Sequence, residues 1–482
     1  MNVPLLIACL VCAPTLQAQE PVDTTIIARI AEKARAGSRV RPLFTYLTTT
    51  IGPRLAGTPA YNQAAAWAAD RFRDWGLQNV QLEPFAFGRG WSLQGLTLEM
   101  TAPRYFPLVG YPEAWSAATA GMVVGAPVYI GDWTEAQVRA RAAQLRGRIV
   151  LATRPQPGFI DADRPQPTES EGRARIGAPP TLRAEGPVDR QALSALLREV
   201  GAAAMLQPSQ GQHGTMFVLG RRTTPPDAVP SIILASEHYG LLVRMLQAGD
   251  PLTLRVAVDV AYHDADSNSY NVIADLPGTD SVVGNEVVMM GAHLDSWHSS
   301  SGGTDNADGV AVVMEAMRIL KALGIQPRRT VRATLWGAEE QGLLGARAHV
   351  ARHYEGETNA VARERVSVYF NVDPGTGPIY GWYLEENVPA GRIFDVWIGA
   401  LREHGARRNV IDRIGSTDHV PFNVAGIPGF NAVQDYVDYD VRTHHTNTDF
   451  YERVRETDLQ QAAIVLATFV YHAAMRDDKI PR

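Results

Sequence analysis

The spacing of hydrophobic positions predicts an α/β fold in the second half of the chain. Apolar runs typical of buried strands cover residues 286–291, 330–336, 366–371 and 429–433. Apolar positions three or four residues apart predict helices over 307–323, 341–353, 390–404 and 457–475. Because strands and helices alternate, we expect a mixed, mostly parallel sheet flanked by helices on both faces.

The first half follows a different pattern. Helical spacing over 59–75 is ended by Gly76, and a short strand is expected over 80–85. Short β-like runs such as GRIVLAT and PSIILAS then surround one helical segment, and residues 155–187 are rich in Pro, Gly, Arg and Glu, which predicts a mobile loop. We therefore expect a β-rich insert at 103–262 between two parts of one domain, 19–102 and 263–482.

The amino terminus has a short apolar run, VPLLIACLV, followed by small and polar residues up to Ala18. This pattern predicts a signal peptide over 1–18 and a secreted or periplasmic protein, with a buried N-terminal helix as the alternative. The run is too short to span a membrane. Both cysteines, Cys9 and Cys12, lie in this segment, so the mature chain would lack disulfides and any metal site would use His, Asp and Glu.

The composition of the chain limits the classes of partner that it could bind. The chain has 482 residues, 45% of them hydrophobic, which is enough for two or three domains with a large core. Its formal net charge of -6 provides no broad basic surface, so we expect neither nucleic acid nor anionic lipid as a partner. The oligomeric state is left open, with a homodimer as one option.

Candidate ligands for metal ions follow three predicted strands and recur near the carboxyl end. Ligands of open α/β sheets bind beyond the carboxyl ends of the strands, so these positions carry functional weight. Each residue alone has a structural explanation, such as capping the next helix. Capping does not explain why so many such residues occur together at the ends of adjacent strands. The residues are His293, Asp295, Asp305, Glu339, Glu340, Asn371, Asp373, His444, His445 and Asp449.

Two His, two Asp and one Glu form the nitrogen and oxygen set for two divalent cations, with one carboxylate bridging and a second glutamate left over. Two such ions activate a water and stabilise the oxyanion of a tetrahedral intermediate. The remaining glutamate would accept the proton of that water and pass it to the leaving amine, and the adjacent pair Glu339 and Glu340 suits this division. Asp295, two residues after His293, is placed to orient the imidazole.

The run GAHLDSWHSSSGGTDNADGVAVVMEAMRILKALGIQPRRTVRATLWGAEEQGLLGA resembles the co-catalytic di-zinc exopeptidases of the bacterial leucyl aminopeptidase type. It is most similar to their plasma glutamate carboxypeptidase (carboxypeptidase Q) branch. IGPRLAGTPAY and NVIADLPGTD fit as well, and the resemblance extends from about Thr45 to about Met475. It implies the zinc-exopeptidase α/β/α sandwich, and for the insert a protease-associated domain that borders the cleft.

The resemblance also implies individual roles. His293 and Asp373 would bind separate metals, Asp305 would bridge them, and Glu340 and His445 would complete the two spheres. Glu339 would be the general base, and Asp295 is counted with it as catalytic for orienting the His293 imidazole. His445 is preferred to His444 because HTNTD fits the family's histidine followed four residues later by aspartate. The implied cofactors are two Zn²⁺, with another divalent metal as the alternative.

Further residues have weaker claims on the substrate. STDHVPF resembles the aminopeptidases and glutaminyl cyclases more than the carboxypeptidase Q branch, which makes Asp418 and His419 candidates for lining the pocket or supporting a ligand. Tyr436 and Tyr439 are candidates to steady the oxyanion, and Arg442 to hold a substrate carboxylate. Loop-stabilising roles are the alternative for all five.

We therefore expect a zinc-dependent exopeptidase that hydrolyses a terminal bond of peptides or dipeptides, with aminopeptidase activity favoured. A dipeptidase or carboxypeptidase of the carboxypeptidase Q type is the next alternative. Glutaminyl cyclase chemistry, on a similar scaffold with a single zinc, is another. The alternative from a different class is a binding protein on an inactive peptidase scaffold.

Overall fold

Seven strands form the main sheet of the protein, and four parallel strands lie at its centre. The computed structural model describes residues 20–168, 187–225 and 227–482, so the expected signal peptide lies outside them. The neighbouring pairs β13–β12, β12–β14 and β14–β16 are parallel, and the outer pairs are antiparallel. In order across the sheet, the strands are β1 (Gln78–Ala86), β11 (Asn268–Leu276), β13 (Thr330–Trp336), β12 (Val287–His293), β14 (Val366–Asn371), β16 (Gly429–Asp435) and β15 (Thr376–Tyr383).

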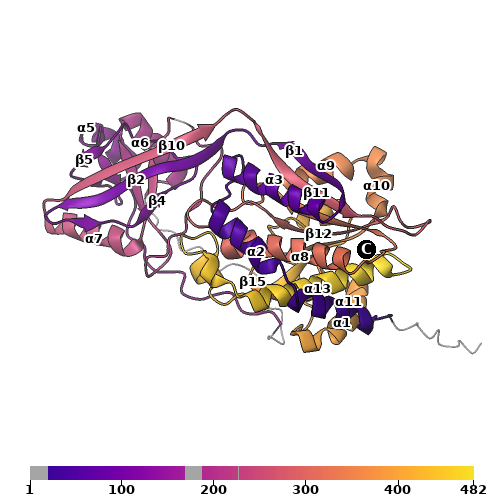
Figure 1. The fold of residues 1–482 in the computed structure, drawn as a ribbon. Coiled ribbons are helices and arrows are strands. Elements are labelled where there is room, and N and C mark those ends of the chain that lie inside the picture. The colour runs from indigo at the N-terminus through magenta and orange to yellow at the C-terminus, as the bar shows by residue number, and fades with distance from the viewer. Residues whose placement is uncertain (1–19, 169–186, 226) are drawn as a thin grey trace, which may run out of the picture.

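Successive residues of the central strands point into two separate hydrophobic cores. In β12, Val288, Met290 and Ala292 belong to the larger core, and Met289 to the core on the opposite face. Helices cover both faces (Figure 1), so the α/β fold class is confirmed. The larger core includes α1 (Thr24–Arg35), α2 (Val40–Thr45), α3 (Pro59–Asp74), α8 (Asp308–Ala322), α11 (Val388–Ala400) and α13 (Glu456–Met475), and the opposite face carries α9 (Leu344–His353), α10 (Ala360–Arg365) and α12 (Val420–Val424).

A second unit is built from two smaller sheets. Its four-stranded sheet has the order β3 (Phe106–Pro107), β2 (Gly90–Ala102), β10 (Thr253–His263) and β5 (Val123–Gly125). Its five-stranded sheet has the order β4 (Gly110–Pro112), β9 (Ser231–Leu234), β8 (Ala204–Pro208), β7 (Ile149–Leu151) and β6 (Val128–Tyr129). Four helices complete the unit: α4 (Glu135–Ala140), α5 (Ala142–Leu145), α6 (Arg190–Val200) and α7 (Ser236–Ala248).

The β2–β10 pair connects the two units as a long antiparallel ribbon (Figure 1). The pairing runs from Gly90 opposite His263 to Ala102 opposite Thr253. The sheet of the second unit therefore begins at Gly90, before the expected start of the insert at 103. Gly88 and Gly90 mark a turn at the entrance of this strand, but the insert was expected to begin only after the strand.

Helix α9 begins later than expected, at Leu344 instead of Gln341. The chain enters it through Ala338 and Leu343, which have φ of 57° and 61°, a region that interrupts a right-handed helix. The 390–404 helix also differs: α11 ends at Ala400, and a separate turn covers Arg402–His404.

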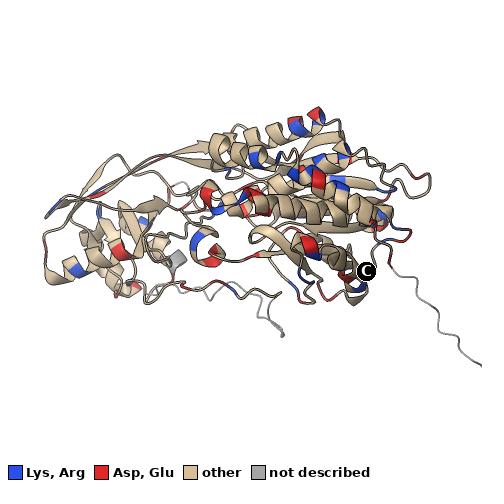
Figure 2. Cartoon of the chain, turned by 60° about the horizontal axis from the view of Figure 1, so that its bottom comes forward, with Lys and Arg blue, Asp and Glu red and all other residues tan. Residues whose placement is uncertain are grey.

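Acidic and basic residues are interspersed over both units (Figure 2). None of the helices in the described ranges is long and apolar enough to cross a membrane.

Candidate active site

The five residues expected to bind metal converge beyond the carboxyl ends of the central strands. His293 ends β12, Glu340 follows β13, and Asp373 follows β14. The His293 Nε2 atom lies 3.1 Å from Asp305 Oδ1 and 3.8 Å from Asp373 Oδ1. The His445 Nε2 atom lies 2.9 Å from Glu340 Oε2 and 3.4 Å from Asp305 Oδ2. The structure thus brings together residues that are up to 152 positions apart (445 minus 293) in the sequence.

Asp305 faces both histidines with different oxygens, as expected of a bridging carboxylate. The distances group His293 with Asp373 and His445 with Glu340. This differs from the expectation that His293 and Asp373 would serve separate ions. The reason is topological: β12 and β14 are parallel neighbours, so the residues that follow them emerge side by side.

Several acceptors in this cluster are buried without a hydrogen-bond donor. Asp305 Oδ2 and Glu340 Oε1 accept no hydrogen bond from the described residues, although buried polar atoms normally find a partner. Burial and the nearby Asp305 raise the pKa of Glu340 to about 7. Burial, together with Asp373 and Glu340, raises the pKa of Glu339 well above its usual value. An excess of buried carboxylates with free oxygens fits a site for divalent cations.

Asp295 holds the turn that carries the glutamate pair. Its two carboxylate oxygens accept hydrogen bonds from the backbone N–H of Glu339 (3.1 Å) and of Glu340 (3.3 Å). The Nδ1 atom of His293 lies 3.0 Å from the backbone oxygen of Asp295 and 3.7 Å from its Oδ1. The imidazole is therefore oriented mainly by the carbonyl of Asp295, while its carboxylate positions the two glutamates.

His444 and His445 lie in a stack with Tyr439. The His444 ring centroid is 5.0 Å from that of Tyr439 and 3.8 Å from that of His445. Burial and the neighbouring His445 lower the pKa of His444 to about 3. His444 also lies near enough to Asp305 to be an alternative nitrogen donor. Of the two histidines, His445 is the one that contacts Glu340.

The tyrosines and the arginine of the same loop have different surroundings. The Tyr439 hydroxyl is buried and has no hydrogen-bond partner, and the charges of Asp305 and Asp373 act on it. The Tyr436 hydroxyl lies 2.9 Å from that of Tyr383. The Arg442 Nη1 atom donates to Gln212 O (3.3 Å) and Thr215 Oγ1 (3.1 Å) in the second unit. Of these residues, Tyr439 has the hydroxyl best placed to act on a substrate.

Asp418 and His419 are both fully buried behind the glutamate pair. Neither carboxylate oxygen of Asp418 has a hydrogen-bond partner, and burial with nearby acids raises its pKa well above the usual value. His419 Nε2 lies 3.2 Å from Glu385 Oε1. Asp418 therefore belongs to the acidic cluster, whereas His419 is engaged in its own ion-pair contact.

Arg54 supports the site, and sequence reasoning assigned it no role. Its buried guanidinium donates to five backbone carbonyls, which come from Leu47, Gly52, Leu294, Ser301 and Gly302. Burial lowers its pKa to about 10, so it stays charged at neutral pH. It thereby fixes both ends of the loop between His293 and Asp305. The only feature of the sequence that could have indicated this role is the position of the arginine inside IGPRLAG, which belongs to the resemblance.

Asp449, one of the candidate ligands in the sequence, contacts the backbone of the loop that carries Asp305. Its carboxylate accepts the backbone N–H of Thr304 (2.8 Å) and of Asp305 (3.1 Å). The spacing of four residues after His445 thus brings an acceptor to the backbone of the bridging aspartate, which makes Asp449 a positioning residue.

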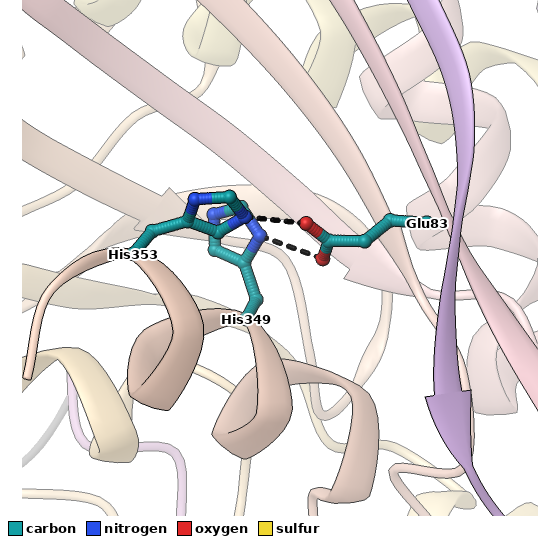
Figure 3. A group of neighbouring side chains, drawn as sticks. All are labelled: Glu83, His349 and His353. Carbon is teal, nitrogen blue, oxygen red and sulfur yellow. Dashed lines mark hydrogen bonds and ion pairs between the residues drawn. The ribbon is translucent and has the colours of Figure 1, made fainter.

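A second histidine–carboxylate cluster lies between β1 and α9 (Figure 3). Glu83 Oε2 lies 2.9 Å from His349 Nδ1, and Glu83 Oε1 lies 2.5 Å from His353 Nε2. Asn271 Nδ2 donates to the same carboxylate at 3.2 Å, and Arg352 Nη1 lies 3.4 Å from it. In contrast to the first cluster, both oxygens of this carboxylate have donors.

The comparison with known proteins agrees with this geometry. Residues 271–470 match the profile of Peptidase family M28. Carboxypeptidase Q of Homo sapiens is 25% identical over 459 residues, covering 95% of this chain and 89% of that protein. Aminopeptidase YwaD of Bacillus subtilis is 32% identical over 200 residues, 40% of this chain and 42% of that protein.

Solved structures agree along nearly the whole chain. A peptidase M28 precursor from Shewanella amazonensis has a TM-score of 0.71 and 25% identity, covering 95% of this chain and 98% of that one. A zinc aminopeptidase from Bacillus subtilis shares the fold, with a TM-score of 0.60, 20% identity and coverage of 95% and 97%. The profile match covers the strands and loops that supply the candidate ligands, so the part of the chain that holds them, residues 271–470, is similar to peptidase family M28.

Proposed function

We propose that the protein is a two-metal exopeptidase that removes a terminal residue from peptides or dipeptides, with aminopeptidase activity favoured. The observation that carries the proposal is the convergence of His293, Asp305, Glu340, Asp373 and His445, with buried carboxylate oxygens that have no donor. The zinc aminopeptidase among the solved relatives supports zinc as the metal.

The distances support one ion held by His293, Asp305 and Asp373 and a second held by Asp305, Glu340 and His445. Divalent ions bound there would polarise the scissile carbonyl and acidify the attacking water. Asp295 and Asp449 would keep the ligands in place, because they hold the backbone of Glu340 and of Asp305.

Proton transfer is assigned to Glu339. Its carboxylate would accept a proton from the attacking water and deliver it to the leaving amine. The Tyr439 hydroxyl, buried and without a partner, would donate a hydrogen bond to the oxygen on which negative charge develops.

The choice of peptide end is the open part of the proposal. Aminopeptidase YwaD supports the amino end, and the full-length similarity to carboxypeptidase Q supports a carboxypeptidase or dipeptidase as the second candidate. We would assay aminoacyl nitroanilides, N-blocked peptides, unblocked dipeptides and peptides with N-terminal Gln, each with and without a chelator. Chelator-sensitive release of nitroaniline supports the aminopeptidase. Cleavage of N-blocked peptides selects the carboxypeptidase, pyroglutamate formation selects the cyclase, and inertness towards all substrates selects the binding protein.

We further propose that residues 1–18 are a signal peptide for a secreted or periplasmic enzyme, and that the second unit is a protease-associated domain. Sequencing the amino terminus of the exported protein tests the first point, with cleavage expected near Ala18.

A further inference from the structure

The candidate ligand His445 lies in a loop, residues 438–447, that contacts the second unit at two places. We propose that the second unit is part of the catalytic machinery: its segments 163–168 and 212–218 hold this loop in the conformation that brings His445 and Tyr439 to Asp305. Arg164 is the principal positioning residue. The inference rests on the proposed function for its catalytic readout, but its structural readout is independent.

The first contact is a buried ion pair between Arg164 and Asp440. Arg164 Nη2 lies 2.6 Å from Asp440 Oδ1, and Arg164 Nε donates to Oδ2 at 2.8 Å. The backbone N–H of Arg164 also donates to Oδ2, at 2.8 Å. The two side chains are only 7% and 1% exposed. A bidentate pair without competing water fixes both distance and orientation, so it restrains the loop more strongly than a surface pair.

The same guanidinium packs against Tyr439 of the loop and against Tyr436 just before it. Its central carbon lies 4.8 Å from the ring centroid of Tyr436 and 5.7 Å from that of Tyr439. Tyr439 in turn stacks on His444, and His444 on His445. A continuous series of contacts therefore leads from Arg164 to the candidate metal ligand.

Asp163 reinforces this contact through the backbone. Its carboxylate accepts the N–H of Asp438 at 2.7 Å and the N–H of Val441 at 3.0 Å. Residues 163–168 belong to the stretch expected to be a mobile loop, but Gln166 also donates to the Gln434 carbonyl at 3.1 Å. This part of the stretch is anchored, because its charged and amide groups find buried partners in the other unit.

The second contact is made by the backbone of segment 212–218. The N–H of Val218 donates to the carbonyl of His445 itself at 3.1 Å, and the N–H of Asn447 donates to Met216 O at 3.1 Å. Phe217 and Thr446 form an antiparallel bridge between these bonds. The residue that would bind metal is thus hydrogen-bonded through its own backbone to the second unit.

Backbone conformation explains why the loop needs such support. Asp438 and His445 both have φ of 61°, a left-handed conformation that is uncommon for residues with a Cβ atom. Each of the two is fixed by the second unit: Asp438 through Asp163, and His445 through Val218. Without these partners, the loop would relax and move His445 away from Glu340 and Asp305.

The test compares Arg164→Ala with Arg154→Ala. Arg154 belongs to the same unit but pairs with Asp132 on the surface, where both side chains are 56% exposed. We expect Arg164→Ala to lower zinc affinity and kcat by about 10- to 100-fold, the range typical for residues that orient metal ligands, and to change KM much less. Zinc affinity is measured by competition with a chromophoric chelator. Arg154→Ala should match the wild type.

Two further variants distinguish a local effect on the loop from a general loss of folding. Arg164→Lys keeps the charge but loses the bidentate geometry, so it should recover only part of the zinc affinity. Should Arg164→Ala not fold, Asp163→Ala carries the same comparison, because it removes the two carboxylate oxygens that accept the N–H groups of Asp438 and Val441, and its position is partly exposed. The proposal is overturned if Arg164→Ala and Asp163→Ala bind zinc and turn over substrate like Arg154→Ala.

A failure of the proposed function can be distinguished from a failure of this inference by a measurement that needs neither zinc nor substrate. If the wild type bound no zinc and cleaved no peptide, hydrogen–deuterium exchange across 438–447 would still decide the structural claim. We expect faster exchange of this loop in Arg164→Ala than in Arg154→Ala. Equal exchange in the two variants would overturn it.

Discussion

The described residues contain two clusters of histidine and carboxylate side chains, one at the strand ends and one between β1 and α9, and of the two the first has carboxylate oxygens without a donor. At the first, Asp305 and Glu340 each keep a buried oxygen without a donor. At the second, each oxygen of Glu83 faces a histidine nitrogen, and Asn271 supplies a further donor.

The difference lies in the balance of charge, because both clusters combine the same residue types. Seven acids, Asp295, Asp305, Glu339, Glu340, Asp373, Asp418 and Asp449, are gathered around three histidines at the first site. One acid serves two histidines at the second, with the Arg352 guanidinium beside it. Buried negative charge in excess calls for cations, whereas a carboxylate saturated by N–H donors is already stable.

The largest effect is expected for Asp305→Ala, which removes the carboxylate shared by both proposed ions. We expect zinc content to fall well below that of the wild type and hydrolysis to fall to background. Elemental analysis of the dialysed protein measures the first and a nitroanilide assay the second. A variant that keeps two zinc ions per chain would contradict the bridging role.

Glu339→Gln should separate chemistry from metal binding. The amide cannot carry a proton, so we expect kcat to fall by about 10² to 10⁴, while zinc content stays at the wild-type level. Steady-state kinetics and elemental analysis on one preparation give both numbers. Loss of zinc in this variant would place Glu339 among the ligands instead.

Glu83→Gln should affect stability and leave the metals in place. Both histidines lose a charged acceptor in a largely buried position, which costs about 1–3 kcal/mol of folding free energy. We expect a lower urea midpoint with unchanged zinc content and kcat within about threefold of the wild type. A drop in zinc of one ion per chain would show that the second cluster also binds metal.

Acid should weaken the second cluster in a predictable direction. Burial alone would raise the pKa of Glu83, but hydrogen bonds from His349 and His353 outweigh it and hold the pKa well below the usual range. Its stabilising contribution is therefore complete above the unfolded pKa of about 4.3 and lost as the pH falls through the folded pKa. The advantage of the wild type over Glu83→Gln in urea should begin to shrink only as the pH falls below about 4.3. A constant difference would contradict this linkage.

Most of the main sheet could be predicted from the sequence, because its central strands are continuous apolar runs and its helices have regular spacing. β12, β13, β14 and β16 begin within one residue of the expected positions. The β2–β10 ribbon was not foreseen as a unit, because pairing between residues so far apart depends on tertiary contacts and leaves no local pattern. The start of α9 was misplaced, since nothing in QGLL shows that Leu343 adopts a positive φ.

The residues of the candidate site also fall into those that the sequence indicates and those that it does not. Residues with specific chemistry, such as His293 and Glu339, stand out at strand ends. Arg54 and Arg164 do not, because an arginine that binds backbone carbonyls or a buried aspartate looks the same in sequence as one in solvent. The pairing of His293 with Asp373 also required the strand order, which spacing along the chain does not encode.

The ribbon that joins the two units has a consequence for how such proteins can be built. Its strands enter and leave the main sheet next to each other, with Gly90 opposite His263. A domain whose two ends lie side by side can be inserted into another domain without distorting its fold. In this protein the inserted unit also supplies the hydrogen bond from the Val218 N–H to the carbonyl of His445.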